Sequence, residues 1–412
     1  YTINSTLQQN QERCDCVAKH AYRQLVLGMI ALFIVMAIGR FAYTPIFPFM
    51  KHAGTMNDQN AGFLATLNYL GYLIGAIIPL GFIFKSKVID LKIYLIINIL
   101  TTIFMGFTEQ YIIWAVYRII SGITSGAVFV LASNIVLEAL KQGRRESISG
   151  LLYSAVGIGI FSSSIFIYFF TTDVRWQATW IILGICSLIG GLLVVIGMTE
   201  NQTVKQDNNV YEHTQQQGQR FPKFMRFFSI AYFCEGAGYI ITGTFLVAIV
   251  KSIPALADYS ALSWMFVGLG AIPSTVIWSM VAEKIGYDKA IYGGFILQII
   301  GISMPVFSHN SISLIISSLL FGATFLGLTT LFMSKGQQLM YKANGNANYV
   351  ATLTVIYSVG QMIAPSISGW LIGDSGNYNA ALIFATMILI VGLINAIVSF
   401  KVTEQKDDVN EY

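Results

Sequence analysis

The chain has 412 residues, of which 55% are hydrophobic and only 11% are charged. A soluble domain carries about 25% charged residues, and its apolar runs rarely approach ~20 residues, so this composition excludes a soluble globular protein. The net charge of +4 does not indicate nucleic-acid binding, because membrane topology accounts for the loop charges. The apolar runs are long and continuous instead of alternating, which excludes an outer-membrane barrel and predicts an all-α integral membrane protein in contact with lipid.

Twelve apolar segments follow one another along the chain, each long enough to cross about 30 Å of hydrocarbon. Residues 1–20 are polar and the first apolar run is too long for a signal peptide, so we expect no cleavable signal. The expected organisation is a cytoplasmic tail (1–21), a six-helix bundle (22–198), a glutamine-rich cytoplasmic linker (199–222), a second six-helix bundle (223–400) and a cytoplasmic tail (401–412). The segments cover about 22–50, 58–84, 91–107, 110–138, 146–170 and 176–198, then 223–251, 260–281, 289–308, 311–334, 346–372 and 377–400.

The distribution of basic residues predicts the orientation of the chain. Of its 24 lysines and arginines, two (Arg40 and Arg118) lie inside apolar segments and three (Lys51, Arg175 and Lys251) lie on one side. The other 19 lie on the side of the two termini. Short cytoplasmic loops carry the excess of positive charge, so both termini are expected to face the cytoplasm. The expected location is the cytoplasmic (inner) membrane of the cell.

Two arginines lie at bilayer depth, where a charge costs about 2.5–3.5 kcal/mol on insertion scales and marks a bundle interior or an aqueous pathway. Arg40 is about 18 residues into a segment that enters from inside, and Arg118 is about eight residues into one that enters from outside. The two are therefore expected at similar depth, where their planar guanidinium groups suit a carboxylate or phosphate. The alternative is a structural role, in which each pairs with a backbone carbonyl, a neighbouring helix or Glu235.

Glu235 lies about 12 residues into the seventh segment, near the middle of the membrane. Tyr232, Tyr239 and Thr242 share its helical face at i−3, i+4 and i+7. Intramembrane carboxylates are normally proton relays or charge partners, so Glu235 is the candidate for proton coupling. Direct binding of a substrate amine and a structural pair with an arginine are the alternatives.

Further polar and small residues inside the segments are weaker candidates, since single Asn, Gln and Tyr residues often serve only as interhelical hydrogen bonds. Small residues allow close helix approach and proline allows bends, which suits sliding contacts between halves or plain tight packing. The remaining substrate-binding candidates are Tyr43, Asn68, Tyr72, Trp114, Tyr117, Tyr239, Tyr357 and Gln361, and the gating candidates are Gly157, Gly360 and Pro365.

The sequence lacks the patterns of enzymatic and metal chemistry. It has no phosphate-binding loop, no nucleophile–base motif and no His/Cys cluster with metal-ligand spacing. Cys14 and Cys16 lie in the polar tail without the further ligands that a zinc site needs. We therefore expect no cofactor, no metal and no enzymatic or ATP-driven activity.

Weak internal similarity relates the two bundles. Residues 38–49 resemble 237–248, and the loop at 84–87 resembles 283–286, both about 199 positions on; residues 153–157 resemble 357–360 at nearly the same offset. Three matches on either side of a central linker indicate a duplicated six-helix half. Parallel repeats of this kind are one of the known transporter layouts, with substrate bound between the halves near the midplane.

The 6 + 6 arrangement resembles the major facilitator superfamily (MFS) over essentially the whole chain. Arg118 followed by Gly122 and Gly126 resembles the signature of that superfamily's fourth helix. The loop at 282–287 is similar to the signature between helices eight and nine, whereas its counterpart between helices two and three is degraded. Residues 39–50, 236–240 and 361–365 are similar to the YbfB/YjiJ-type branch. The resemblance implies alternating access by rocking of the two halves.

These observations predict a secondary active transporter that moves a small organic anion or zwitterion by alternating access, coupled to protons through Glu235, with Arg40 and Arg118 binding the solute. It is expected to work as a monomer, with the solute, protons and lipids as its partners. One alternative is a broad-specificity proton-driven efflux pump whose aromatic residues form an apolar cavity. The other is a membrane sensor or scaffold on a transporter fold, because fold alone does not fix function.

Overall fold

The computed structural model describes residues 2–53, 56–145, 148–171, 176–200, 223–342, 349–373 and 376–407. Within these residues, twelve helical spans are long and apolar enough to cross a membrane, which confirms the expected architecture. The first half contains α1 (Thr2–Leu32), η1 (Phe33–Phe41), α2 (Tyr43–His52), α3 (Asp58–Gly81), α4 (Lys87–Phe104), η2 (Met105–Phe107), α5 (Tyr111–Gln142), α6 (Gly150–Thr171) and α7 (Trp176–Gly197). The second half contains α8 (Lys223–Lys251), η5 (Ala257–Tyr259), α9 (Ser260–Ile285), α10 (Tyr287–Phe307), α11 (Ser311–Lys342), α12 (Tyr349–Ile372) and α13 (Tyr378–Asp407).

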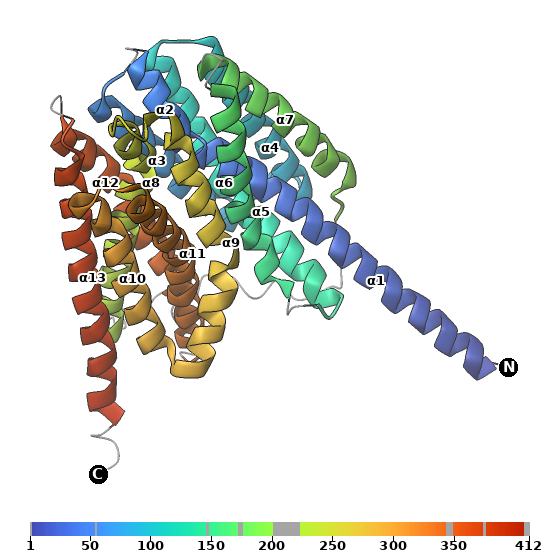
Figure 1. Ribbon diagram of the computed structural model, residues 1–412. Coiled ribbons are helices and arrows are strands. Elements are labelled where there is room, and N and C mark those ends of the chain that lie inside the picture. Colours follow the sequence, from blue (N-terminus) through green and yellow to red (C-terminus); the bar gives the residue numbers. More distant parts are fainter. Residues whose placement is uncertain are drawn as a thin grey trace.

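The two halves lie beside each other, and the start of α1 and the end of α13 lie on the same side of the molecule (Figure 1). We call the side that carries the chain ends the terminal side and the opposite side the distal side. The terminal side is the one that the basic residues assign to the cytoplasm. Of the expected linker, residues 201–222 lie outside the described residues, and so do residues 408–412 of the expected C-terminal tail.

The first membrane span consists of α1, η1 and α2 in succession, and it has irregular hydrogen bonding near Arg40. Residues 33–41 form a π-helix, and α2 begins with Pro45 close to its start and Pro48 inside it. Each proline lacks the N–H that would bond the carbonyl four residues earlier, so Phe41 and Thr44 lose their regular partners. Such π segments occur frequently at functional sites.

The expected cytoplasmic tail at residues 1–21 is helical where the structure describes it. Helix α1 begins at Thr2 and runs without a break into the membrane span. Gln, Glu, Arg, Lys and Ala are good helix formers, so a polar composition does not prevent the span from being extended as helix.

The halves repeat the same internal helix contact. In the first half, a Cβ atom added to Gly71 of α3 would lie 2.3 Å from the carbonyl oxygen of Ile119 of α5. In the second half, one added to Gly270 of α9 would lie 2.4 Å from the carbonyl oxygen of Leu319 of α11. These positions are 199 and 200 residues apart in the sequence. The crossing of α3 with α5 and the crossing of α9 with α11 therefore each depend on a glycine, and the two glycines occupy equivalent positions of the repeat.

The most extensive contacts between the halves in the described residues are those of α3 with α12, α6 with α9, and α2 with α8. The pair α2–α8 places equivalent positions of the repeat against each other, because Thr44 Oγ1 donates to the carbonyl oxygen of Gly243, 199 residues later, at 2.5 Å. Arg40 and Tyr239 have the same separation along the chain. The interface between the halves therefore brings the end of η1 next to the middle of α8.

Candidate functional site

Arg40 is the centre of a buried polar bridge between the two halves. Its side chain is 3% exposed, and Nη2 donates to Oε1 of Gln361 on α12 at 3.0 Å. The amide nitrogen of Gln361 in turn donates to the hydroxyl of Tyr239 on α8. Three of the predicted substrate-binding residues therefore form one hydrogen-bonded chain, and this chain crosses from one half to the other.

Two tyrosines of α3 surround the Arg40 guanidinium in place of a carboxylate. Its Cζ atom lies 4.2 Å from the ring centroid of Tyr72 and 4.6 Å from that of Tyr69. Cation–π contacts are worth about 2 kcal/mol when the cation is desolvated, which offsets part of the cost of burying the charge. Tyr72 is a predicted substrate-binding residue, whereas Tyr69 is not among the predicted residues. The two are three residues apart on one helical face, so their spacing could have identified both.

Arg118 lies against η1, next to the residue that precedes Arg40, and it is held within the first half. Nη1 donates to the carbonyl oxygen of Gly39 at 3.2 Å, and Cζ lies 4.5 Å from the ring centroid of Tyr43. Asn68, another predicted residue, donates its side-chain amide to the carbonyl oxygen of Arg118 at 3.0 Å. Within the part of the chain that the structure describes, Nε and Nη2 of Arg118 are buried without a hydrogen-bond partner, so two donor atoms remain available at this point of the interior.

Asn98 of α4 organises the polar interior of the first half and was not singled out from the sequence. Its amide nitrogen donates to the carbonyl oxygen of Ser121 at 3.0 Å, to Thr124 Oγ1 at 2.9 Å and to Ser125 Oγ at 3.1 Å. Ser121 and Ser125 then donate to the carbonyl oxygens of Gly39 and Val35 in η1. The hydroxyl groups of α5 thus provide partners for carbonyl groups of the π segment next to Arg40.

Glu235 is completely buried within the second half and is not paired with an arginine. The ion pairs found among the described residues are Lys51–Asp58 and Lys87–Glu138, so the predicted alternative of an Arg–Glu pair is not observed. Gln298 of α10 lies beside the Glu235 carboxyl group. However, no polar atom of either side chain makes a hydrogen bond of normal geometry to any residue that the structure describes.

Aromatic rings line the second half between Glu235 and the interface. Tyr232 stacks on Tyr357 with ring centroids 4.5 Å apart, and Tyr357 lies nearly parallel to Tyr239 at 5.9 Å. Tyr239 continues the stack to Phe325 at 5.5 Å. Tyr357 was predicted to bind substrate, and the structure places it deep in this stack with its hydroxyl 3.2 Å from Thr329 Oγ1.

Two predicted residues lie apart from this group. Trp114 donates to the carbonyl oxygen of Met105 at 3.3 Å and packs edge-on against Trp176 of α7. Tyr117 packs on Phe104 of α4, which is itself 42% exposed. Both residues precede Arg118 on α5 within one turn, but their side chains meet α4, η2 and α7 instead of the second half.

The three predicted gating residues lie at close helix crossings. A Cβ atom on Gly157 of α6 would lie 2.7 Å from the backbone nitrogen of Ile272 of α9, at the interface between the halves. The carbonyl oxygen of Pro365 faces Gly62 of α3 at the other interface. Gly360 contacts the backbone of α8 within the second half. Two of the three therefore lie where the halves would move past each other.

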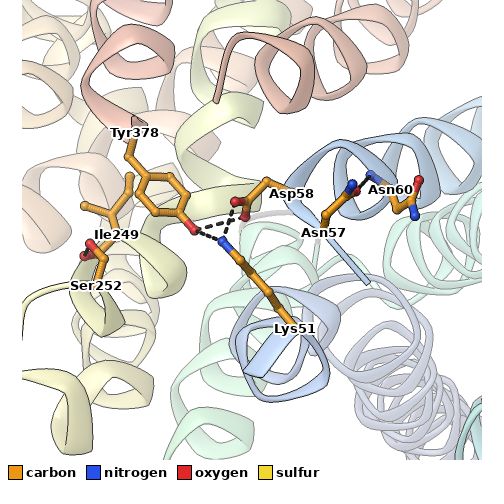
Figure 2. A network of polar contacts seen from close by, with 7 residues as sticks. All are labelled: Lys51, Asn57, Asp58, Asn60, Ile249, Ser252 and Tyr378. Atoms are coloured by element: carbon orange, nitrogen blue, oxygen red, sulfur yellow. Dashed lines mark hydrogen bonds and ion pairs between the residues drawn. The ribbon is translucent and has the colours of Figure 1, made fainter. Parts of the chain in front are cut away.

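A second polar cluster joins the halves at the distal side, and Figure 2 shows its members converging. Lys51 of α2 forms an ion pair with Asp58, and its ammonium group lies 3.1 Å from the hydroxyl of Tyr378 at the start of α13. The hydroxyl of Tyr378 donates to the other oxygen of Asp58 at 2.9 Å. We call Lys51, Asp58 and Tyr378 the distal cluster. Asp58 is 1% exposed, so the ion pair and the hydrogen bond from the opposite half provide its partners inside the protein.

Two repeated six-helix halves joined around a buried cation define an MFS-type membrane transporter, and comparisons with known proteins agree. Residues 32–397 match the family described as "Uncharacterised MFS-type transporter YbfB", so the chain belongs to this family of MFS transporters and is not an enzyme.

Individual proteins show similarity over most of the chain. The "Uncharacterized MFS-type transporter YfhI" of Bacillus subtilis (strain 168) is 21% identical over 327 residues, which are 77% of this chain and 78% of that protein. The crystal structure of the nucleoside transporter NupG superimposes with a TM-score of 0.72 over 93% of this chain and 99% of that chain, at 13% identity. A single-residue variant of NupG gives the same TM-score at 12% identity, covering 92% and 100% of the two chains. At this identity, the NupG structures show the fold alone.

Proposed function

We propose that this protein carries a small organic anion or zwitterion across the cytoplasmic membrane by alternating access, with Arg40 and Arg118 as the groups that bind its carboxylate. The observation that carries the proposal is a surplus of buried guanidinium donors beside η1. Among the described residues, Nε of Arg40 and both Nε and Nη2 of Arg118 have no hydrogen-bond partner. A carboxylate offers about four lone-pair sites and would satisfy guanidinium donors that are otherwise costly to bury.

The position of Arg40 supports a role in the transport cycle. Its partner Gln361 belongs to the opposite half, so a solute that binds Arg40 competes for a contact that joins the halves. A carboxylate is a stronger acceptor for a guanidinium than a neutral amide. Binding of the solute would therefore release this contact and change how the halves are held together.

The conformation described here corresponds to a state closed on the distal side. The distal cluster joins α2 and α3 to α13. A second contact between the halves on this side is made by Lys251 at the end of α8, whose Nζ lies 3.5 Å from the ring centroid of Phe49 on α2. With the orientation that the basic residues predict, the distal side is extracellular. Transport then requires a second state in which these contacts are broken.

Proton coupling through Glu235 is the second part of the proposal. A carboxylate that is completely buried without a cation or a donor costs several kcal/mol, whereas a neutral carboxyl group costs much less. Among the described residues, Glu235 has no cation as a partner, and no donor lies in hydrogen-bond geometry with its carboxyl oxygens. A proton taken up on one side of the membrane and released on the other would therefore accompany the change between states.

Ligand binding followed by transport tests the proposal. Purified protein is screened by thermal shift against benzoate, lactate, glycerol phosphate, uridine and tetraphenylphosphonium, and any hit is used for uptake into proteoliposomes with and without a pH gradient. Carboxylates should stabilise the wild type, and Arg40→Gln should weaken their binding about 10-fold or more, since a hydrogen bond to a charged group is worth about 1.5–3 kcal/mol. Arg226→Gln is the matched control, because Arg226 is exposed at the start of α8. Equal affinity of carboxylates for the wild type and Arg40→Gln would overturn the proposal.

The stacked rings of the second half favour one other function, a proton-driven efflux pump for lipophilic compounds. Large aromatic surfaces next to a buried carboxyl group suit lipophilic cations. In that case tetraphenylphosphonium should stabilise the wild type and fail to stabilise Glu235→Gln, and overexpression should protect cells against several unrelated cations. The same screen thus separates the two functions.

A further inference from the structure

A cluster of aromatic rings lies at the interface between the halves beside Arg40. The ring centroid of Phe41, at the end of η1, lies 6.2 Å from that of Trp264 on α9 and 6.4 Å from that of Phe325 on α11. Phe321 of α11 lies 6.4 Å from Trp264 and 5.5 Å from Phe325. We call Phe41, Trp264, Phe321 and Phe325 the interface cluster. Its first member belongs to the first half, and the other three belong to the second.

The interface cluster is buried and borders directly on the proposed carboxylate site. Each of its four residues is at most 3% exposed. The Cζ atom of Arg40 lies 5.3 Å from the ring centroid of Phe41, so this ring contacts the guanidinium as well as Trp264. Ligand sites are lined mainly by apolar and aromatic side chains, with a few polar groups that fix the orientation of the ligand. The interface cluster therefore has the composition of the apolar part of such a site.

The cluster contains one polar atom, the indole nitrogen of Trp264, and this donor is unpaired. Within the residues that the structure describes, Nε1 of Trp264 is buried and has no hydrogen-bond partner. The N–H of a buried tryptophan usually finds a partner, and an unpaired buried donor is destabilising. Trp278 on the same helix shows the usual arrangement, because it donates to the carbonyl oxygen of Ala323 at 2.7 Å. Trp180 of α7 is also unpaired, but its helix packs against α1 and α4 of the first half.

We infer that the solute is an aromatic carboxylate with a hydrogen-bond acceptor on its ring, and that Trp264 is a further binding residue that donates to this acceptor. The inference rests on the proposed function, which assigns the carboxylate to Arg40 and Arg118, and it specifies the chemical class of the solute. A single ring, Phe41, contacts both the Arg40 guanidinium and the Trp264 indole. A solute ring of the same size that stacks on Phe41 therefore reaches both groups, with its carboxylate at Arg40 and its acceptor at Trp264.

Such a solute interacts with both halves at once. The contacts of Phe41 with Trp264 and Phe325 cross the interface, so they are lost when the halves separate at this point. A solute ring can replace them, since aromatic pairs are favourable in stacked and edge-on arrangements alike. A ligand shifts an equilibrium only when it binds the two states with different affinity. A solute held between Arg40 of the first half and Trp264 of the second meets this condition, because its contacts depend on the relative position of the halves.

Affinities for a matched series of carboxylates test the inference. Isothermal titration of the detergent-solubilised full-length protein compares cyclohexanecarboxylate, benzoate, nicotinate, isonicotinate and 4-acetylbenzoate. Benzoate has an aromatic ring where cyclohexanecarboxylate has a saturated one, and the last three compounds each add an acceptor to the aromatic ring. We expect benzoate to bind about 5-fold tighter than cyclohexanecarboxylate, the factor for one aromatic pair. The best of the three acceptor compounds should bind about 5-fold tighter than benzoate, the factor for one hydrogen bond.

Two tryptophan variants of the same helix identify the donor. Trp264→Phe keeps an aromatic ring and removes the N–H, so it should bind benzoate with nearly unchanged affinity and lose the advantage of the acceptor compound. Trp278→Phe is the matched control, because it removes an N–H that is bonded to the backbone of α11, and it should keep the advantage. Melting temperature and elution volume identify correctly folded variants. Phe325→Leu adds an independent measurement, since it should reduce the preference for benzoate over cyclohexanecarboxylate and leave the advantage of the acceptor compound.

The outcomes separate the inference from the proposed function. If cyclohexanecarboxylate binds as tightly as benzoate and both bind more weakly to Arg40→Gln, the proposed function stands and the inference is overturned. An acceptor compound that has no advantage in the wild type, or that keeps its advantage in Trp264→Phe, would show that Trp264 does not bind the solute. If no carboxylate binds, or if Arg40→Gln binds them all with wild-type affinity, the proposed function itself fails and the inference fails with it.

Discussion

The two halves share one helix arrangement but differ in how their polar interiors are connected. Asn98 of α4 and Gln298 of α10 are 200 residues apart in the repeat. Asn98 donates to α5 at several points and belongs to a network that reaches η1. Gln298 makes no hydrogen bond of normal geometry and lies beside Glu235, whose counterpart 199 residues earlier is Met36.

This difference indicates that the charge in the interior of the first half is fixed, whereas the charge in the interior of the second half can change. The interior of the first half holds two permanent cations, Arg40 and Arg118, because an arginine side chain is not deprotonated in proteins. Arg118 donates to the carbonyl oxygen of Gly39, which also accepts a hydrogen bond from Ser121. The second half holds the carboxyl group of Glu235, whose charge can change. It lies next to the side-chain amide of Gln298, which can pair with the protonated or the ionised carboxyl group. The repeat thus supplies the same scaffold twice, and the substituted polar residues assign the cation to one half and the proton to the other.

The largest effect is expected from removing the carboxyl group. Glu235→Gln keeps the size and hydrogen-bonding capacity of the side chain, so the fold should persist, but it can no longer take up and release a proton. Accumulation of a transported carboxylate against its gradient should be abolished, while exchange across the membrane continues. Uphill uptake and counterflow in proteoliposomes measure the two quantities, and uphill uptake by the variant at the wild-type level would show that Glu235 does not carry the proton.

Paired substitutions of Asn98 and Gln298 test the comparison itself. Asn98→Leu removes several buried hydrogen bonds, each worth roughly 0.6 kcal/mol in membrane proteins, and leaves their partners unsatisfied. We expect a loss of about 2 kcal/mol or more in the free energy of unfolding. Gln298→Leu removes an amide without such bonds and should change it by less than about 0.5 kcal/mol. Unfolding in detergent measures both, and equal losses would refute the proposed difference between the halves.

The distal cluster should control how often the distal side opens. Tyr378→Phe removes the hydrogen bond from the second half to Asp58 and keeps the ring, which should shift the equilibrium toward the distal-open state by about 1 kcal/mol or roughly 5-fold. The readout is the labelling rate of Thr242→Cys, in a cysteine-free background, by a membrane-impermeant maleimide applied from the distal side. Thr242 is 1% exposed, so labelling requires opening. A rate unchanged by Tyr378→Phe would show that the cluster does not hold the halves together.

The smallest effect is expected at the other ion pair. Lys87 and Glu138 lie 3.7 Å apart with side chains 49% and 47% exposed, and both belong to the first half. Exposed ion pairs contribute about 0–1 kcal/mol to the free energy of unfolding. Since both residues belong to the first half, their distance does not depend on the relative position of the halves. Lys87→Gln should therefore leave both the melting temperature and the labelling rate of the Thr242→Cys reporter at their unmodified values. A change as large as that of Tyr378→Phe would mean that this pair also senses the motion.

The order of residues alone predicted the twelve spans, the internal repeat and the position of Arg40 and Arg118 within their spans. Hydrophobic length fixes a span because lipid offers no partner for the backbone, and position within a span fixes depth. The helical period also placed Glu235 on one face with Tyr232 and Tyr239. These properties depend only on the order of residues within single helices.

The contacts between helices follow from the tertiary structure alone, because it places each helical face against a particular neighbouring helix. It joined Arg40 to Gln361, added Tyr69 and Asn98, and directed Trp114 and Tyr117 toward other helices. It also kept Glu235 apart from both arginines. The physical reason is that lipid and protein interior are similarly apolar, so a face is chosen by close packing and interhelical hydrogen bonds between distant segments, which no local pattern encodes.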